Sequence, residues 1–243
     1  MADEAHPEKT LADLEESRHE LESLTYSVAH DLRSPLRTIE GFARALGEDC
    51  GEALDEDCRR YLQHVLDAAQ RMSGMLEGLL GLARILGAEL HPVRLDLSYI
   101  AREILERLRA AEPARTADIS IAENLTAEGD PTLMTAALEA LLQNAWKFTR
   151  GREPARIEVG IRAGVAPPVY FVSDNGAGFD MRYAAKLFRP FQRLHSEREF
   201  EGLGLGLAGA HRIMRRHGGR IWAEAAPDQG ARFHFTLQED AQA

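Results

Sequence analysis

Two long helical patterns occupy the first part of the chain. Apolar residues recur at alternating steps of three and four from Leu11 to Leu46, which is typical of the buried stripe of a bundle helix. A second stripe runs from Leu62 to Leu86, after a Gly- and acid-rich break at residues 47–55. Two amphipathic helices joined by a short loop predict an antiparallel hairpin. Because one hairpin leaves a face of each helix uncovered, we expect two copies to dimerise as a four-helix bundle.

The pattern changes at Gly87–Pro92, where Gly, His and Pro end the helical period and predict a hinge at residues 88–92. Asp130 as N-cap and Pro131 in the first turn predict the start of a later helix. Helices and strands interleaved in this way predict an α/β sandwich with helices on one face of its sheet. The other expected elements are helices over 97–111 and 205–217, and strands over 119–125, 156–162, 169–173, 220–224 and 232–237.

Composition and charge exclude several classes of protein. The 243 residues are 44% hydrophobic and 28% charged, which is normal for a globular protein. Of the net charge of −10, −9 lies in residues 1–60, with 16 acidic and 7 basic side chains, so we expect no nucleic-acid partner. We expect no membrane span, because no uncharged apolar run reaches about 18 residues, and no secretory signal, because the N-terminus lacks a basic flank followed by an apolar stretch. The two cysteines, Cys50 and Cys58, fit a reducing compartment, and we expect a cytoplasmic protein.

His30 is a candidate nucleophile on the first helix. It stands midway between Val28 and Leu32 of the predicted buried stripe, so we expect its side chain to face solvent. The neutral form of an exposed imidazole is well populated near pH 7 and can act as a nucleophile. Pro35 falls inside the helical pattern, where it costs about 3 kcal/mol. Such a cost close to an exposed histidine indicates a functional bend.

A candidate nucleotide site begins in the helix that Asp130 opens. Asn144 and Lys147 are three residues apart and share a face of that helix, and Phe148 follows them. An amide oxygen is a suitable ligand for Mg²⁺, and an ammonium group binds phosphate. Lys147 is one of only three lysines in the chain, so its place in this pattern is notable.

Two glycine motifs follow this helix. Asp174 comes after a predicted strand and can accept a hydrogen bond from the amine of adenine, while Gly176 and Gly178 let the backbone approach a flat base. Asp-Asn-Gly is also a common turn, so this motif is weak by itself. The second motif opens the last predicted helix, where N–H groups and the helix dipole favour a phosphate. Its residues are Gly202, Leu203, Gly204, Leu205 and Gly206.

The segment between the two glycine motifs is long and charged. Residues 179–201 contain phenylalanines on both sides of a proline, including Phe188, with Arg193 close by. A loop of this length with apolar anchors is typical of a mobile lid. The same phenylalanines would also suit a plain surface loop whose aromatic rings join the core.

The order and spacing of these motifs resemble those of bacterial sensor histidine kinases. The string around His30 and the strings of the nucleotide site are similar to the H-box, N-box, G1, F-box and G2 motifs, in family order across residues 25–237. The resemblance implies that ATP phosphorylates His30, that Asp31 acts as a base or orients the imidazole, and that Ser34 occupies the position linked to phosphatase activity. Neighbouring side chains on a helix do not face each other, so the role of Asp31 rests on the resemblance. ATP and Mg²⁺ would be held by the nucleotide-site residues named above, with Asn144 as the metal ligand.

The resemblance also divides the chain and implies its partners. We expect a signalling-helix stub at 1–24, a dimerisation and histidine phosphotransfer domain at 25–87, the hinge, and a GHKL-type ATP-binding domain at 93–243. The implied partners are a second copy and the receiver domain of a response regulator, to which the phosphoryl group passes. A sensor domain or sensor protein would act upstream, outside this chain. The residues after the H-box are similar to those of kinases linked to PAS or phytochrome-type sensors.

Ala140 departs from the family pattern, because a second Asn usually stands there, one turn before Asn144. A degenerate kinase that binds ATP as a scaffold, without autophosphorylation, is therefore an alternative. Related ATPases of the gyrase, chaperone or mismatch-repair type need a general-base Glu at this position, so Ala140 disfavours them.

Overall fold

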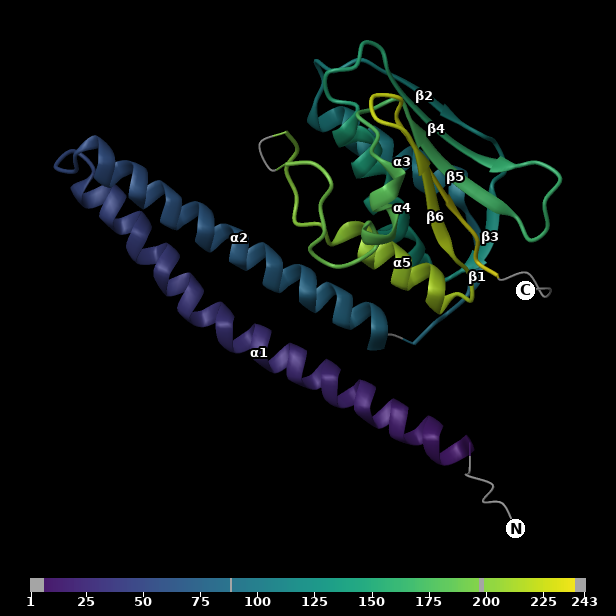
Figure 1. Ribbon diagram of the computed structural model, residues 1–243, viewed down its shortest axis with the longest axis horizontal. Helices are drawn as coiled ribbons and strands as arrows, with labels where there is room; N and C mark the ends of the chain where they lie inside the picture. Colours follow the sequence, from purple (N-terminus) through teal and green to yellow (C-terminus); the bar gives the residue numbers. More distant parts are fainter. Residues whose placement is uncertain (1–6, 88, 197–198, 239–243) are drawn as a thin grey trace. The chain divides into compact units, whose positions relative to one another are not determined.

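The computed structural model describes residues 7–87, 89–196 and 199–238, with side chains from residue 23 onward. The chain divides into two compact units, Met1–Ala88 and Glu89–Ala243. The first unit consists of long helices, and the second combines helices with β-sheet (Figure 1).

The first unit is an antiparallel helical hairpin. Its helices are α1 (Pro7–Cys50), which continues through Pro35, and α2 (Glu56–Gly87). Asp55 caps the start of α2, because its carboxylate accepts a hydrogen bond from the backbone N–H of Cys58 over 2.7 Å. No helix in the described part of the chain is apolar enough over a sufficient length to span a membrane.

The apolar stripe expected to be buried along α1 is exposed within one chain, so it does not form the contact with α2. Val28 is 53% exposed and Phe42 is 73% exposed. The buried face lies one residue further on and consists of Ala29, Leu36 and Ala43, at steps of seven. Both the face at Val28 and the face at Ala29 contain apolar residues, so helical periodicity alone did not show which of them contacts α2. The small alanines let α2 approach closely, while the larger apolar residues lie beside the contact. The other exposed apolar residues are Leu32, Ile39 and Leu46 on α1 and Tyr61, Val65 and Met72 on α2.

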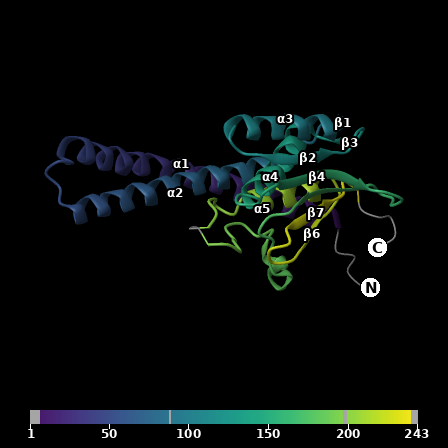
Figure 2. The ribbon, with the colours of Figure 1, turned by 90° about the horizontal axis from the view of Figure 1, so that it is seen from above.

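The second unit packs helices against a five-stranded mixed sheet (Figures 1 and 2). The strand order is β2-β4-β5-β7-β6, with β2 parallel to β4 and the other neighbours antiparallel. A separate two-stranded antiparallel sheet joins β1 to β3. The elements are β1 (Val93–Asp96), α3 (Leu97–Ala111), β2 (Ala117–Ile121), β3 (Thr126–Gly129), α4 (Pro131–Phe148), β4 (Ala155–Arg162), β5 (Val169–Asp174), the 3₁₀ helix η1 (Met181–Lys186), α5 (Gly206–Arg216), β6 (Ile221–Ala225) and β7 (Ala231–Phe235).

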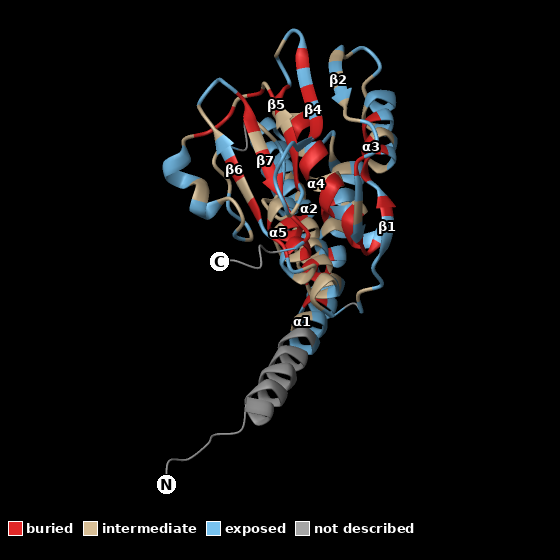
Figure 3. Cartoon of the chain, turned by 90° about the vertical axis from the view of Figure 1, so that its right-hand side faces the viewer, coloured by how far each residue is buried: buried red, intermediate tan, exposed pale blue. Residues whose placement is uncertain are grey.

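The core of this unit lies between the five-stranded sheet and the helices. Figure 3 shows buried residues concentrated in the central strands and in α4. On the other face of the sheet, Arg232 and Glu158 form an ion pair over 3.2 Å, as expected where an antiparallel sheet meets solvent. The expected α/β sandwich is thus confirmed. Its most buried side chains include Met134, Leu138, Leu141, Leu142, Ile157, Val172, Ile213 and Phe235.

Most expected elements lie within one or two residues of the observed ones, but the region before α4 differs. The strand expected over 119–125 is β2, which ends at Ile121, and a separate strand, β3, begins at Thr126. β3 and its partner β1 have four residues each, which is too short for a periodic signal. These strands form because they pair with each other, and that pairing joins segments about thirty residues apart.

Candidate functional site

His30 and Asp31 are both exposed on α1, and their side chains approach each other. The His30 Nδ1 lies 3.3 Å from the Asp31 Oδ1, although the two side chains are 69% and 76% exposed. Helix geometry had not predicted this contact, which forms because both solvated side chains turn towards each other at their tips. The predicted exposure of His30 is confirmed, but the burial of Val28 that we gave as its reason is not. Ser34 is exposed one turn further on, on the same side of α1.

Asp130 fixes the start of α4, the helix that carries the next candidates. Its Oδ1 accepts a hydrogen bond from the Leu133 backbone N–H over 3.0 Å, which confirms the predicted N-cap. Its Oδ2 accepts from the His91 N–H over 3.2 Å, and its own N–H donates to the His217 Nε2 over 2.9 Å. The hydrogen bond from Leu133 is the main reason why the pKa of Asp130 lies below its usual value. The start of α4 is therefore capped and also anchored by two other segments, at His91 and at His217.

The last turns of α4 present Asn144, Lys147 and Phe148. The Lys147 Nζ donates to the Glu201 backbone carbonyl over 3.0 Å and lies 4.4 Å from the centre of the Phe148 ring. Burial, followed by the positive charge of Arg193, lowers the pKa of Lys147. The Asn144 side chain makes no hydrogen bond to a residue that the structure describes, so its amide oxygen is available to a ligand. Excess positive charge beside a free amide oxygen suits a metal-bound polyphosphate.

Asp174 lies at the end of β5 and is only 9% exposed. Its Oδ1 accepts a hydrogen bond from the Gly176 N–H over 2.8 Å. Burial raises the pKa of Asp174 to about 6, against the opposing effect of hydrogen bonds from the backbone of Gly176 and Ala231. A buried carboxylate with little competing water is well suited to accept a hydrogen bond from a ligand amine.

The turn after Asp174 has no room for side chains. A Cβ on Gly176 would lie 2.4 Å from the Phe148 carbonyl oxygen, which also accepts a hydrogen bond from the Ala177 N–H over 3.0 Å. Gly178 has a φ of +59°, and a Cβ there would lie 2.0 Å from the Ala226 carbonyl oxygen. The structure therefore brings the end of α4 into direct contact with the first glycine motif, as the nucleotide-site prediction requires.

Part of the segment between the glycine motifs packs on Phe148. The Phe148 ring centre lies 5.3 Å from that of His195 and 4.8 Å from that of Phe200. The His195 Nε2 is 2.8 Å from the Gly178 carbonyl oxygen. This aromatic cluster attaches the segment to both α4 and the first glycine motif.

Phe188 and Arg193 have separate places in this segment. Phe188 stacks on His211 of α5, with ring centres 5.6 Å apart, so it anchors the segment to α5. Arg193 donates from Nη2 to the Phe200 backbone carbonyl and contributes positive charge near Lys147. The predicted apolar anchor is thus present at Phe188, and Arg193 lies beside the candidate phosphate-binding lysine.

The second glycine motif leads into α5. Gly202 has a φ of +134°, and a Cβ there would lie 3.3 Å from the Lys147 Nζ. Gly204 has a φ of +72°, and a Cβ there would lie 2.5 Å from the Gln192 carbonyl oxygen. Leu203 and Leu205 are half-buried between these glycines. The N-cap residue Leu205 offers no side-chain hydrogen bond to α5, so N–H groups of the first turn remain available for an anion.

Ala140 has a packing role that its residue type alone did not reveal. A Cβ on Gly206 would lie 3.3 Å from the Ala140 Cβ, so α4 and the start of α5 are in close contact here. A longer side chain at position 140 would have to share this space. The departure from the family pattern at Ala140 therefore coincides with a close helix contact beside the site.

The sequence pattern did not indicate His195 or Gly230, which also shape the site. Gly230 has a φ of +83°, and a Cβ there would lie 1.9 Å from the Asp174 carbonyl oxygen. The Pro-Asp-Gln-Gly string at residues 227–230 is a turn signal that could have identified Gly230. His195 has no local signal, because its contacts with Phe148 and Gly178 depend on tertiary structure.

Comparison with known families identifies the class of protein. Residues 20–87 match the His Kinase A (phospho-acceptor) domain. Residues 129–241 match the histidine kinase-, DNA gyrase B- and HSP90-like ATPase family. The chain therefore belongs to the histidine kinases, and consists of their phospho-acceptor hairpin followed by their α/β ATP-binding domain.

Individual relatives agree with this class. The chain is 34% identical to cyanobacterial phytochrome B of Nostoc sp. over 230 residues, covering 93% of this chain and 30% of that protein. It is 35% identical to the methanogenesis regulatory histidine kinase FilI of Methanothrix harundinacea, covering 95% of this chain and 26% of that protein. The crystal structure of full-length ShkA in complex with AMPPNP has a TM-score of 0.61 at 25% identity, covering 88% of this chain and 45% of that chain. The chain thus spans less than a third of these two curated relatives.

Proposed function

We propose that this chain transfers the γ-phosphoryl group of ATP to His30 and then to an aspartate of a response-regulator receiver domain. The observation that carries the proposal is the exposed His30–Asp31 pair, in a chain whose second unit is a histidine kinase ATP-binding domain. The role of Ser34 in the reverse, phosphatase reaction is part of the same proposal. The division into domains at 25–87 and 93–243, joined at 88–92, agrees with the two compact units.

In this proposal the contact between His30 and Asp31 supports a separate role for each imidazole nitrogen. When Nδ1 carries the proton, it donates to the Asp31 carboxylate, and Nε2 presents its lone pair to solvent. Nε2 attacks the γ-phosphorus, a P–N bond forms, and the bond to the bridging oxygen breaks to release ADP. Asp31 then takes up the Nδ1 proton, which removes the positive charge from the phosphorylated ring.

The nucleotide would be held by the site on α4, β5 and α5. Asp174 accepts from the adenine amine, while Lys147, Arg193 and the N-terminus of α5 bind the phosphates. The free amide oxygen of Asn144 fits Mg²⁺, which would neutralise phosphate charge when bound. Phe148 and the glycine motifs exclude water and let the backbone approach the nucleotide.

The hairpin would work as a homodimer. The exposed apolar residues of α1 and α2 would be buried in a four-helix bundle formed with a second copy. The chain covers only 30% and 26% of these two curated relatives, and we infer that a sensor acts upstream of the hairpin. Cys50 and Cys58 are exposed free thiols, which favours a reducing, cytoplasmic location.

The test is incubation with γ-labelled ATP and Mg²⁺. We expect acid-labile, alkali-stable label on the wild type and none on H30Q. Asp31→Asn should label at least about 10²-fold more slowly, which is the usual contribution of a general base. His64→Gln is the matched control, because His64 is also an exposed histidine of the hairpin, and its label should be unchanged. Nucleotide binding without label on the wild type would refute the proposal and favour the scaffold alternative.

A further inference from the structure

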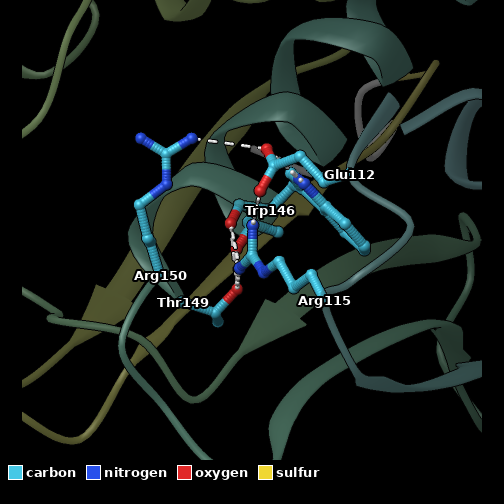
Figure 4. A network of polar contacts seen from close by, with 6 residues as sticks. Glu112, Arg115, Trp146, Thr149 and Arg150 are labelled. Atoms are coloured by element: carbon cyan, nitrogen blue, oxygen red, sulfur yellow. Dashed lines mark hydrogen bonds and ion pairs between the residues drawn. The ribbon is translucent and has the colours of Figure 1, made fainter. Parts of the chain in front are cut away.

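A polar network joins the segment after α3 to the end of α4 beside the nucleotide site, and its members Glu112 and Arg115 belong to none of the motifs (Figure 4). Arg115 donates from Nη2 to the Trp146 backbone carbonyl over 2.5 Å and to the Thr149 Oγ1 over 2.8 Å. Its guanidinium carbon lies 4.3 Å from the centre of the Trp146 ring. The Trp146 Nε1 donates to the Glu112 Oε1 over 3.1 Å, and the Arg150 Nη2 donates to the same oxygen over 3.3 Å.

This network completes the hydrogen bonding at the C-terminal end of α4. The last four carbonyls of a helix have no partner inside the helix. The Ala145 carbonyl accepts from the Thr149 hydroxyl over 2.7 Å, and the Lys147 carbonyl accepts from the Arg150 N–H over 3.1 Å. The Trp146 carbonyl accepts a hydrogen bond from the Arg115 side chain, and the Phe148 carbonyl accepts one from the Ala177 N–H. α4 is thus fixed to Arg115 on one side and to the Asp174 turn on the other, with Lys147 and Phe148 in between.

Most of the side chains in this network are buried. Trp146 is 3% exposed, Thr149 is fully buried, and the Arg115 side chain is 13% exposed. The buried Arg115 Nη1 makes no hydrogen bond and lies 3.7 Å from the Glu112 Oε2. The Glu112 side chain is 37% exposed, so its ion pair with Arg115 is only partly buried, and such a pair contributes little stability by itself. The planar guanidinium, stacked on a ring and bonded to two oxygens, fixes geometry in a way that an apolar side chain does not.

We propose that Arg115 and Glu112 are positioning residues for nucleotide binding, acting through Trp146 to hold Lys147 and Phe148 in register with Asp174. This inference rests on the proposed function, because it takes Lys147 as a ligand of the nucleotide phosphates. In this proposal neither Arg115 nor Glu112 binds the nucleotide directly. Loss of the network leaves α4 packed through its apolar face but frees its last turn.

The test compares two arginines that contact α4: Arg115, in the segment after α3, and Arg107, on α3. Arg115→Met removes the network, whereas Arg107→Met removes the exposed pair between the Arg107 Nη2 and the Glu139 Oε1, which are 3.0 Å apart. We expect R115M to raise the KM for ATP in autophosphorylation about ten- to a hundredfold, the effect of a small misplacement of binding groups. The kcat at saturating ATP should fall less than threefold, because bound phosphates reorder Lys147. R107M should match the wild type in both.

Two further variants separate positioning from general loss of structure. Arg115→Lys keeps the charge but lacks the planar fork, so its KM should lie between those of wild type and R115M. If R115M does not fold, this comparison is made with R115K and Glu112→Gln, both of which should raise KM. In a double-mutant cycle, R115M should add little to the effect of Lys147→Ala, because both act on the same phosphate contact.

Three outcomes would count against a positioning role of Arg115. A KM for R115M within twofold of wild type, equal effects of R115M and R107M, or full additivity with K147A would each overturn the inference. The same measurements distinguish it from the proposed function. If K147A binds ATP as tightly as the wild type, Lys147 is not a ligand of the phosphates and the proposed function loses that residue. If K147A binds ATP weakly but R115M binds it normally, only the role of Arg115 is overturned.

Discussion

Removing the charge of the buried Asp174 carboxylate should have opposite effects on the stability of the fold and on the binding of ATP. The perturbation is Asp174→Asn, which keeps the shape of the side chain and an oxygen that can accept the Gly176 N–H, but removes the charge. In the folded protein the pKa of Asp174 is raised from 3.8 to about 6 by burial. The folded state therefore holds a proton that the unfolded state has lost, and stability falls as the pH rises from about 4 through 6.

The size of the effect follows from this difference in pKa. The pKa of Asp174 rises from 3.8 in the unfolded chain to about 6 in the folded protein, and each pKa unit corresponds to about 1.4 kcal/mol. At pH 7 the ionised carboxylate therefore lowers the free energy of unfolding by about 3 kcal/mol. The asparagine amide must replace a carboxylate that also accepts from the Ala231 backbone, so we expect D174N to be more stable by about 1–3 kcal/mol. Each 1 kcal/mol should raise the Tm by about 2–4 °C in a domain of this size. Binding of ATP should weaken about 10–100-fold, because hydrogen bonds to charged acceptors are the stronger ones.

The assay is urea denaturation of wild type and D174N, followed by tryptophan fluorescence at pH 7 and at pH 4. Both tryptophans of the chain, Trp146 and Trp222, belong to the ATP-binding unit, so the signal reports that unit alone. Displacement of a fluorescent ATP analogue at pH 7 gives the affinity. The stability difference should be largest at pH 7 and should nearly vanish at pH 4, where Asp174 is protonated in the folded wild type.

Two results would refute this reasoning. If D174N is less stable than wild type at pH 7, the buried charge is not a net cost to the fold. If the stability difference is the same at both pH values, the effect does not come from ionisation of Asp174. A stable D174N that binds ATP normally would leave the argument on stability intact but remove Asp174 from the nucleotide site.

Two other predictions concern backbone fit and assembly. Gly178→Ala should lower the free energy of unfolding by about 3 kcal/mol or more, because its positive φ and its contact with the Ala226 carbonyl leave no room for a Cβ. Gly151→Ala, also at positive φ but with open space around it, should cost about 1 kcal/mol by the same fluorescence assay, and equal losses would contradict the steric argument. Phe42→Glu should reduce the mass measured by light scattering from that of a dimer to the 27.0 kDa of one chain, because a charge would enter the proposed bundle interface. Arg44→Glu, on the opposite flank of Ala43, should remain dimeric, and a dimeric F42E would place the interface elsewhere.

Local signals in the sequence were sufficient for much of the second unit. The cap at Asp130 and the proline after it predicted the start of α4, because a side-chain acceptor and a missing N–H act within one turn. The glycines at 176, 178, 202 and 204 were predicted correctly as special positions, because each has either a close backbone approach or a positive φ that leaves few other choices. The order of the glycine motifs, together with the strings around His30 and Asn144 and the segment between the glycine motifs, was also enough to indicate a histidine kinase.

Contacts between distant segments were decided only by tertiary structure. Periodicity predicted that α1 is amphipathic, but the choice between the face at Val28 and the face at Ala29 depended on how closely α2 could approach. β1 and β3 exist because they pair with each other, and four residues carry no period of their own.

The same division holds at the site. Residue type and spacing identified Lys147 and Asp174, since chemistry is a property of the side chain. The raised pKa of Asp174, the packing of His195 on Phe148, and the attachment of Trp146 to Arg115 are properties of burial and of neighbours brought from elsewhere in the chain. Such terms depend on three-dimensional distance, which short-range sequence patterns do not encode.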